Sequence, residues 1–195
     1  DYFPDILKND YFIKQLSIEN ARRAIVEPAA LQGDFVSSPF KFESEALVDK
    51  LLNELADAET KLVDPIQIQI VCTNLEKEKV IKEGKTIIVS SDIPPIMDII
   101  NVFYKNCWRQ IDNAFEISAT EFNKIRKEYI SNLIVNDRRN LVHSDLLMTE
   151  TTDSHNQKIT DLLLSLGLIR VVLSGKDKFY QLCHDRFIKP VADDV

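Results

Sequence analysis

The sequence predicts a mainly α protein in which a bundle of helices is followed by a winged helix with a short β-hairpin. Apolar residues recur at helical spacing along most of the 195 residues. Glycine occurs only four times, and its positions divide the chain into mostly helical stretches. Residues 158–187 have the pattern helix, glycine, strand, tight turn, strand and helix, which is typical of a winged helix.

The first helices are predicted from capping residues and apolar periodicity. Ser17 can cap a helix over 18–27, and Pro28, which has no amide hydrogen, should end or kink this helix. A second helix is predicted within 43–58, because its apolar residues fall on one face at helical spacing. These residues are Leu47, Val48, Leu51, Leu52 and Leu55.

Pro65 begins a segment with an ambiguous pattern. Its isoleucines at alternate positions resemble a strand, but the apolar residues further along continue at helical spacing. Proline is common in the first turn of a helix, and a helix is therefore favoured over 65–79. The next segment, 85–91, is predicted to be either a short extended segment or a loop.

Two longer helices are predicted in the middle of the chain. The first follows Pro94-Pro95, and its apolar face consists of Ile96, Ile99, Ile100, Phe103, Cys107 and Trp108. The second lies within 118–135, and its apolar face consists of Phe122, Ile125, Tyr129 and Leu133. Ser118 and Glu121 have the spacing of a capping box, which supports a helix start at this point.

The winged helix is predicted from the last third of the chain. Its helix before the hairpin has an apolar stripe of Ile159, Leu162, Leu163 and Leu166. Gly167 suits the left-handed position that follows a helix. Ser174-Gly175-Lys176 should form the tight turn between the two strands of the hairpin.

Composition limits the classes of function. The formal net charge of −7 and the pI of about 5.0 argue against a large surface that follows nucleic-acid phosphates. No apolar run approaches the roughly 18 residues of a membrane-spanning helix, and no signal peptide is recognisable. Cys72, Cys107 and Cys183 lie far apart among apolar neighbours, so buried free thiols and a cytoplasmic location are expected. Because the first residue is not methionine, a piece of a longer protein is expected.

Four motifs occur in a fixed order along the chain. The pattern A-x-x-A-I-x-x-P-A is matched by Ala21–Ala29, and an LL-x-x-L run in an acidic helix by Leu51–Leu55. A proline-led helix is matched by Pro65–Cys72, and the ending Y-x-L-(S/C)-H-D-x-(L/F) by Tyr180–Phe187. Together they resemble the C-terminal half of STAND-type NTPases, in particular the bacterial novel STAND class.

The resemblance implies three parts and a regulatory role. Residues 1–34 would be the end of a nucleotide-binding core, 35–115 a helical lid domain and 116–195 a winged-helix domain. Such proteins bind ATP or ADP with magnesium and act as signalling switches in bacterial antiviral defence. The lid and the winged helix close over a nucleotide held by an upstream domain of the same chain, and activation can produce a homo-oligomer.

The chain departs from the family in lacking the phosphate-binding half. It contains no GxxxxGK[ST] loop (Walker A) and no apolar strand that ends in paired acids (Walker B). The upstream domain would supply both. No ATPase activity, no bound nucleotide and no membrane contact are therefore expected of this region alone.

The resemblance implies two nucleotide-binding residues, His184 and Pro65. His184 would contact the β-phosphate of ADP and hold the switch closed, and Pro65 would pack near the adenine or ribose. Each also has a structural interpretation: Asp185 caps a helix over 186–191 with His184 packed or capping beside it, and Pro65 only begins a helix. Adjacent residues of a strand point to opposite faces, so Cys183, His184 and Asp185 cannot form a catalytic triad.

Two other polar groups invite a functional interpretation. Arg138 and Arg139 form a compact basic pair at a junction between predicted helices. Solvated loop charges are the simplest interpretation, and contact with a phosphate, an acidic domain or DNA is the alternative. His143 and Asp145 suggest a metal site, but no further ligand stands at suitable spacing and His155 lies in a polar segment, so no metal is expected.

The alternative function is that of a winged-helix transcriptional regulator that binds DNA. Asn156, Gln157 and Lys158 begin the helix that would enter a groove, and Lys176 and Lys178 lie in the wing. The rest of that helix is a nearly unbroken leucine run, which is better suited to packing on protein. Nucleic acid is therefore not the expected partner.

Overall fold

The computed structural model describes residues 14–31, 39–115, 118–147 and 153–194. It confirms the predicted fold class, because helices dominate and the sheets consist of only two or three strands. Within the described ranges, no helix is long and apolar enough to cross a membrane.

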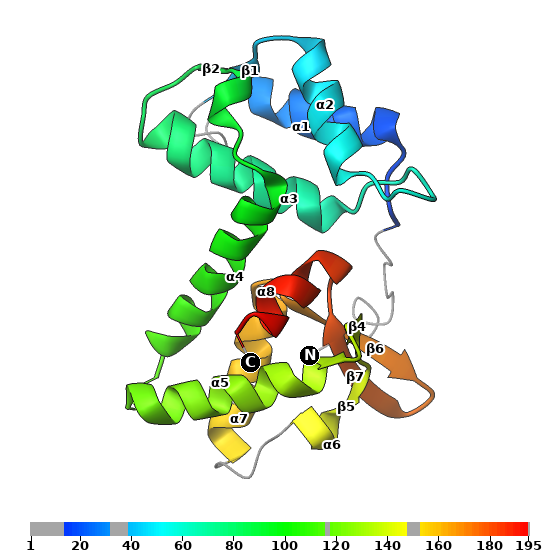
Figure 1. The fold of residues 1–195 in the computed structure, drawn as a ribbon, viewed down its shortest axis with the longest axis vertical. Coiled ribbons are helices and arrows are strands. Elements are labelled where there is room, and N and C mark those ends of the chain that lie inside the picture. The colour runs from blue at the N-terminus through cyan, green and yellow to red at the C-terminus, as the bar shows by residue number, and fades with distance from the viewer. Residues whose placement is uncertain (1–13, 32–38, 116–117, 148–152, 195) are drawn as a thin grey trace, which may run out of the picture. The chain divides into compact units, whose positions relative to one another are not determined.

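The chain divides into two compact units, Asp1–Ile96 and Met97–Val195, and each is described by itself. In Figure 1 the first unit is coloured from blue to green and the second from green to red. The predicted division into 1–34, 35–115 and 116–195 stays a prediction.

Most of the described part of the first unit consists of the helices α1 (Ile18–Ala30), α2 (Glu45–Leu55) and α3 (Pro65–Leu75), as Figure 1 shows. The side chains of Ser17, Ser44 and Asp64 each accept a hydrogen bond from a backbone N–H in the first turn of the helix that follows. The five apolar residues predicted for one face of α2 are all buried. Pro65 is the first residue of α3, so the predicted helix is confirmed and the strand alternative is wrong.

Pro28 does not end α1, contrary to one of the two predicted outcomes. The helix continues for two residues, to Ala30. Proline lacks the N–H of one helical hydrogen bond, but other backbone contacts hold the last turn. The Leu31 N–H donates to the Pro28 carbonyl (3.2 Å), and the Phe40 N–H donates to the Ala29 carbonyl (2.8 Å). Ala29 is also buried in a small apolar core, which favours the continued helix.

A parallel pair of short strands joins distant parts of the first unit. β1 (Lys41–Phe42) pairs with β2 (Ile87–Ile88), so the segment 85–91 contains a strand, which was one of its two predicted states. Between α3 and β2 the chain forms a π-helical segment, η1 (Glu76–Ile81), which the sequence did not predict. So short a segment carries no periodicity that distinguishes it from the preceding α-helix.

The described residues of the second unit form the α-helices α4 (Ile96–Asp112), whose first residue belongs to the first unit, α5 (Ala119–Leu133), α6 (Ser144–Leu147), α7 (Asp153–Ser165) and α8 (Ile188–Ala192). The predicted apolar face of α4 is buried except for Phe103, which is half-buried, and Tyr104 and Ile111 are buried as well. Ser118 caps α5 as predicted, because its hydroxyl accepts a hydrogen bond from the Glu121 N–H (3.2 Å).

The predicted winged helix is present in the second unit. Its sheet has the order β5-β7-β6, with β5 (Val142–His143), β6 (Ile169–Ser174) and β7 (Asp177–Leu182). Ser174 pairs with Asp177, so the turn between β6 and β7 has two residues and begins at Gly175, with a φ of 63°. Gly167 has a φ of 74°, and the Leu168 N–H donates to the Leu163 carbonyl (3.0 Å), as in a Schellman end of a helix. The strand β5 was not predicted.

A second hairpin corrects the prediction for the basic pair. β3 (Ile134–Val135) and β4 (Arg138–Arg139) form an antiparallel pair, so the two arginines lie in a strand rather than in a loop. Asn136 and Asp137, with φ values of 52° and 55°, form the turn. Both residue types tolerate the left-handed region that a two-residue hairpin turn requires.

Candidate functional site

Pro65 lines a hollow in the first unit. The hollow has a volume of about 400 Å³ and lies between α1, α3 and Phe40. Most of its wall is apolar, with Pro28, Pro65 and Phe40 among the lining residues, and Gln69 and Thr73 add polar groups. Such a volume and such a wall are typical of a small-molecule site.

Cys72 also lines this hollow, but its thiol is not a nucleophile at neutral pH. Burial, and to a smaller extent the charge of Glu76, raise the pKa of Cys72 to about 12. Burial likewise raises the pKa of Cys107 to about 12. All three cysteines are free, as predicted; Cys107 is buried, whereas Cys72 and Cys183 are only half-buried. The thiols of Cys72 and Cys107 are therefore inert, protonated groups.

His184 caps the short 3₁₀ turn Asp185–Phe187 at the end of the winged helix. Its Nδ1 accepts a hydrogen bond from the Arg186 N–H (3.0 Å), and the ring is half-buried. The ring is therefore not sealed in the apolar interior. Because Nδ1 accepts, a neutral ring must carry its proton on Nε2, which is then a hydrogen-bond donor.

Asp185 is not the N-cap, and this prediction is wrong. Its carboxylate forms an ion pair with the guanidinium of Arg139, from Nε to Oδ1 and from Nη2 to Oδ2, the latter at 3.3 Å. The backbone turns one residue earlier than expected, so that His184 takes the capping position. An arginine distant in sequence competes for the carboxylate that the local preference for Asp would use as a cap.

Arg139 is the residue that sequence reasoning missed in this region. Its Nη1 donates to the carbonyls of Leu182 (3.2 Å) and Cys183 (3.3 Å), in addition to the pair with Asp185. The guanidinium thus attaches the hairpin β3-β4 to the residues on either side of His184. The Asn-Asp pair before the two arginines was the available signal, because it favours a hairpin that brings Arg139 back toward the sheet.

The other histidines do not form a metal site in the part of the chain that the structure describes. The Nδ1 of His143 accepts from the Asp145 N–H (3.3 Å) and lies 3.6 Å from an Asp145 carboxylate oxygen, while the ring packs edge-on against Phe179. The side chain of His155 lies outside the described residues. No group of three or more His, Cys, Asp or Glu side chains gathers within the described ranges.

The polar residues at the start of α7 have partners within the second unit, although only Asn156 is buried. Asn156 is fully buried, and its carbonyl accepts from the Tyr129 hydroxyl (2.8 Å). Gln157 donates to Asp161 (2.8 Å). The Lys158 ammonium donates to the Ala114 carbonyl (3.1 Å) and lies over the ring of Phe115. Asn156, the first of the three residues predicted to contact bases, is therefore directed into the protein core and not toward a DNA groove.

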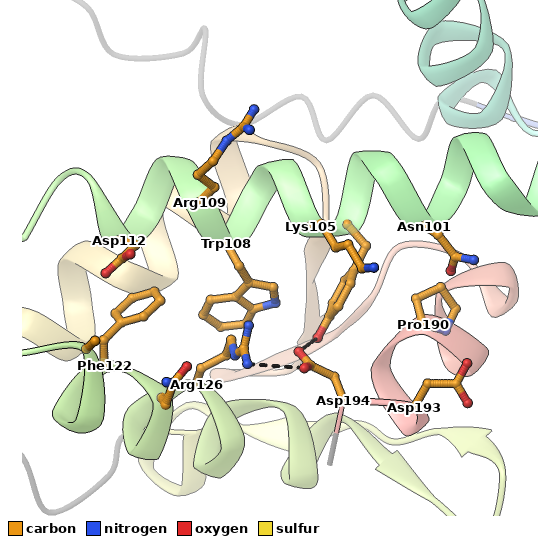
Figure 2. Close-up of a pocket in the computed structure, with 13 residues that line it drawn as sticks. Asn101, Lys105, Trp108, Arg109, Asp112, Phe122, Arg126, Pro190, Asp193 and Asp194 are labelled. Carbon is orange, nitrogen blue, oxygen red and sulfur yellow. Dashed lines mark hydrogen bonds and ion pairs between the residues drawn. The ribbon is translucent and has the colours of Figure 1, made fainter.

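A second hollow, which the sequence did not indicate, lies in the second unit between α4, α5 and α8. Figure 2 shows it with Trp108 and Arg126 directed toward Asp194, and its volume is about 570 Å³. The Tyr104 hydroxyl donates to Asp194 Oδ2 (2.8 Å), and Arg126 Nη2 lies 3.1 Å from Asp194 Oδ1. Tyr104 is 90 residues from Asp194, so no local motif could have revealed the group.

The side chains that line this second hollow present hydrogen-bond donors to its interior. Burial, and then the neighbouring Asp194 carboxylate, raise the pKa of the Tyr104 hydroxyl, so it remains a donor at neutral pH. The indole N–H of Trp108 opposes this shift in pKa, but it meets no acceptor with hydrogen-bond geometry among the described residues. Arg126 Nε is buried and likewise lacks an acceptor among these residues.

Comparison of the chain with models of known protein families, with curated proteins and with solved structures found no match. The functional assignment therefore depends on the residues and on their geometry.

Proposed function

We propose that this chain is the lid and winged-helix part of a STAND-type ATPase that acts as a signalling switch in bacterial defence. An upstream domain of the same chain would hold ATP or ADP with magnesium, and this part would close over the nucleotide. Exchange of ADP for ATP would release the winged helix and permit a homo-oligomer to form. This part alone would have no ATPase activity.

The observation that carries the proposal is the hollow in the first unit. Two separate motifs of the resemblance, Ala21–Ala29 and Pro65–Cys72, contribute to its wall. Pro28 belongs to the first motif and Pro65 to the second. Helix α2 lies between these motifs in the sequence, yet both contribute to one concave surface. The small and apolar wall suits the flat face of an adenine or a ribose, and Gln69 and Thr73 offer hydrogen bonds at its edge.

The geometry of His184 supplies the second support. Nδ1 accepts from the Arg186 N–H, so a neutral ring carries its proton on Nε2, and this tautomer can donate to a β-phosphate oxygen. Arg139 holds the backbone on either side of His184 through the Leu182 and Cys183 carbonyls and the Asp185 carboxylate, so the position of the ring is fixed. A switch needs a contact that differs between its two states, and a bond to a phosphate oxygen provides one.

The first experiment is to sequence the coding region upstream of Asp1. A P-loop is expected within roughly 150–250 residues, the length of one domain. An open reading frame that begins at this point, or an upstream domain without a P-loop, would overturn the proposal.

The second experiment separates the cap from the contact with nucleotide in the full-length protein. His184→Ala removes both, whereas His184→Asn keeps a side-chain acceptor for the Arg186 N–H, because Asn is a good N-cap. Both variants should release ADP more readily, with an affinity reduced roughly 5- to 150-fold, and should raise basal signalling. Equilibrium binding of a fluorescent ADP analogue measures this change.

His143→Ala is the matched control for both variants. It removes another imidazole whose Nδ1 accepts a backbone N–H two residues further along. ADP affinity should not change in this control. If all three variants retain ADP equally well, His184 has only a structural role.

The DNA-binding alternative is less well supported by the start of α7. Asn156 is buried, and Gln157 and Lys158 have partners within the unit. Fluorescence anisotropy with random duplex DNA at low salt should detect no binding in the non-specific range of about 10⁻⁴–10⁻⁶ M. Salt-dependent binding in that range would favour the transcriptional regulator instead.

A further inference from the structure

The second hollow already holds one carboxylate, which belongs to the chain itself. Asp194 accepts from the buried hydroxyl of Tyr104 (2.8 Å) and pairs with Arg126 Nη2 (3.1 Å). These donors come from α4 and α5, and Asp194 follows α8, so three separate elements build the arrangement (Figure 2). The walls of this hollow therefore have the chemistry of a carboxylate receptor.

Asp194 uses only part of this receptor. Nε and Nη2 lie on the same edge of a guanidinium, and a carboxylate binds most strongly when it accepts from both. Asp194 is bonded to Nη2, while Arg126 Nε is buried and has no acceptor among the described residues. The indole N–H of Trp108, a side chain only 2% exposed, also points into the hollow without an acceptor among these residues.

A buried N–H donor without an acceptor is energetically costly, and this argues for a ligand that supplies the acceptor. A buried N–H without an acceptor lacks the hydrogen bond that it would have in water, and such groups are rare in folded proteins. Both unfilled N–H groups are shielded from solvent, so an acceptor reaches them only if a neighbour moves. Asp194 is about one quarter exposed and occupies the same guanidinium edge, so it is the neighbour that an entering group would replace.

We propose that the hollow between α4, α5 and α8 binds a carboxylate of a ligand in place of Asp194. The ligand carboxylate would accept from Arg126 Nε and Nη2, from the Trp108 indole N–H and from the Tyr104 hydroxyl. Asp194 would then be released together with the end of α8. This proposal does not depend on the proposed nucleotide switch, because all its residues lie in the second unit.

Charges at the mouth of the hollow suggest that the ligand is not a polyanion. Lys105 and Arg109 line the hollow, but so do Asp112 and Asp193, and these charges balance. A single carboxylate, carried either by a small metabolite or by an acidic side chain of a peptide, fits this balance. The shared chemistry is a planar anion with two oxygen acceptors.

Trp108 provides the measurement, because it is the only tryptophan of the chain. The 195-residue chain is titrated with sodium acetate at constant ionic strength while its intrinsic fluorescence is recorded, and acetamide serves as the uncharged probe of the same shape. Acetate should change the fluorescence in the millimolar range, with saturation, and acetamide should not. A response to acetamide as strong as that to acetate would overturn the assignment to carboxylates.

Variants test the competition directly. Asp194→Ala removes the internal competitor and should make acetate bind about tenfold more tightly, which corresponds to about 1.4 kcal/mol. Arg126→Gln should abolish the response. Lys124→Gln is the matched control, because Lys124 is exposed, pairs with Glu128 on its own helix and does not line the hollow, so its removal should not affect binding. Far-UV circular dichroism checks that each variant is folded.

Two further comparisons identify the source of the carboxylate and the competing explanation. A short blocked peptide with a central Asp, compared with the same peptide carrying Asn, distinguishes an acidic peptide from a small metabolite. If wild type and Asp194→Ala both fail to respond to acetate and to the Asp peptide, the unfilled donors hold only a structural water. That result would overturn the proposal.

Discussion

The two compact units use polar groups differently. In the first unit, the polar side-chain contacts between its helices lie at the surface, as in the pair of Arg22 from α1 with Asp49 from α2. Its buried carboxylate, Asp92, bonds within its own segment, to Lys85 and to the Val89 N–H. In the second unit the polar contacts between elements reach the interior. The Tyr129 hydroxyl joins α5 to α7, both ends of this contact are buried, and Tyr104 is buried beneath Asp194.

This difference teaches which kind of recognition each unit can provide. Apolar burial has no direction, so the first unit can form a hollow whose selectivity comes from shape. Hydrogen bonds are directional and costly when incomplete, so the second unit can position donors for one kind of acceptor. The three predictions that follow test this comparison.

The largest effect is expected from a cavity in each core. Leu52 and Leu163 are both fully buried, in the first and second unit respectively, and their replacement by alanine should each cost about 2–5 kcal/mol of unfolding free energy. Trp108 reports on the second unit alone. Leu163→Ala should therefore lower the urea midpoint measured by fluorescence, whereas Leu52→Ala should lower only the midpoint measured by circular dichroism. Equal shifts in both signals for both variants would mean that the chain unfolds as one cooperative unit.

An intermediate effect is expected from Arg139→Ala. The variant loses two hydrogen bonds to the Leu182 and Cys183 carbonyls, so the free energy of unfolding should fall by about 1–3 kcal/mol. The pair with Asp185 contributes little of this, because that carboxylate is 65% exposed. Urea unfolding followed by Trp108 fluorescence measures the change.

Arg138→Ala is the control for this prediction. Arg138 is the exposed neighbour in the same strand, and its removal should change the free energy of unfolding by no more than about 0.5 kcal/mol. An equal loss in both variants would show that the strand itself, and not the guanidinium of Arg139, holds the hairpin.

The smallest effect is expected from Asp92 at low pH. The hydrogen bond from the Lys85 ammonium, followed by the bond from the Val89 N–H (3.0 Å), lowers the pKa of Asp92. A lowered folded-state pKa stabilises the protein above the ordinary carboxyl pKa of about 3.9, and this contribution is lost as the pH falls through the folded-state value. In the Asp92→Asn variant, the unfolding free energy of the first unit should therefore fall less steeply as the pH is lowered through the acid range.

Urea unfolding followed by circular dichroism across the acid range checks this dependence on pH. Glu59→Gln is the control, since Glu59 is an exposed acid of the same unit and its replacement should leave this dependence unchanged. If Asp92→Asn has the same dependence on pH as the wild type, the buried carboxylate does not contribute to it.

The helices could be predicted from the sequence because their signals are local. Ser17 and Ser118 cap their helices as predicted, and the periodic apolar residues of α2 and α5 are buried. Gly167 and Gly175 have the positive φ values that their positions require. Each of these signals depends on residues within one or two turns of each other.

The missed features depend on contacts between residues distant in sequence. The strand β5 has two residues and exists because β7 offers it a partner, so it has no alternating pattern of its own. Asp185 does not cap the following turn as predicted, because its carboxylate pairs with Arg139, which lies 46 residues earlier. The acceptor of Tyr104 lies 90 residues away. The only sequence signal for any of them is the Asn-Asp turn, which favours the hairpin of Arg139 but does not identify the partner of this residue.

The turn at Asn136–Asp137 is a place where the backbone locally has the mirror-image handedness. A D-amino acid adopts this conformation without the steric cost that an L-residue bears. Chemical synthesis could therefore install the D-enantiomer at either position and leave Arg139 in its place. The hairpin is thus a site where the chain would accept inverted chirality, which the interior of any of its helices would reject.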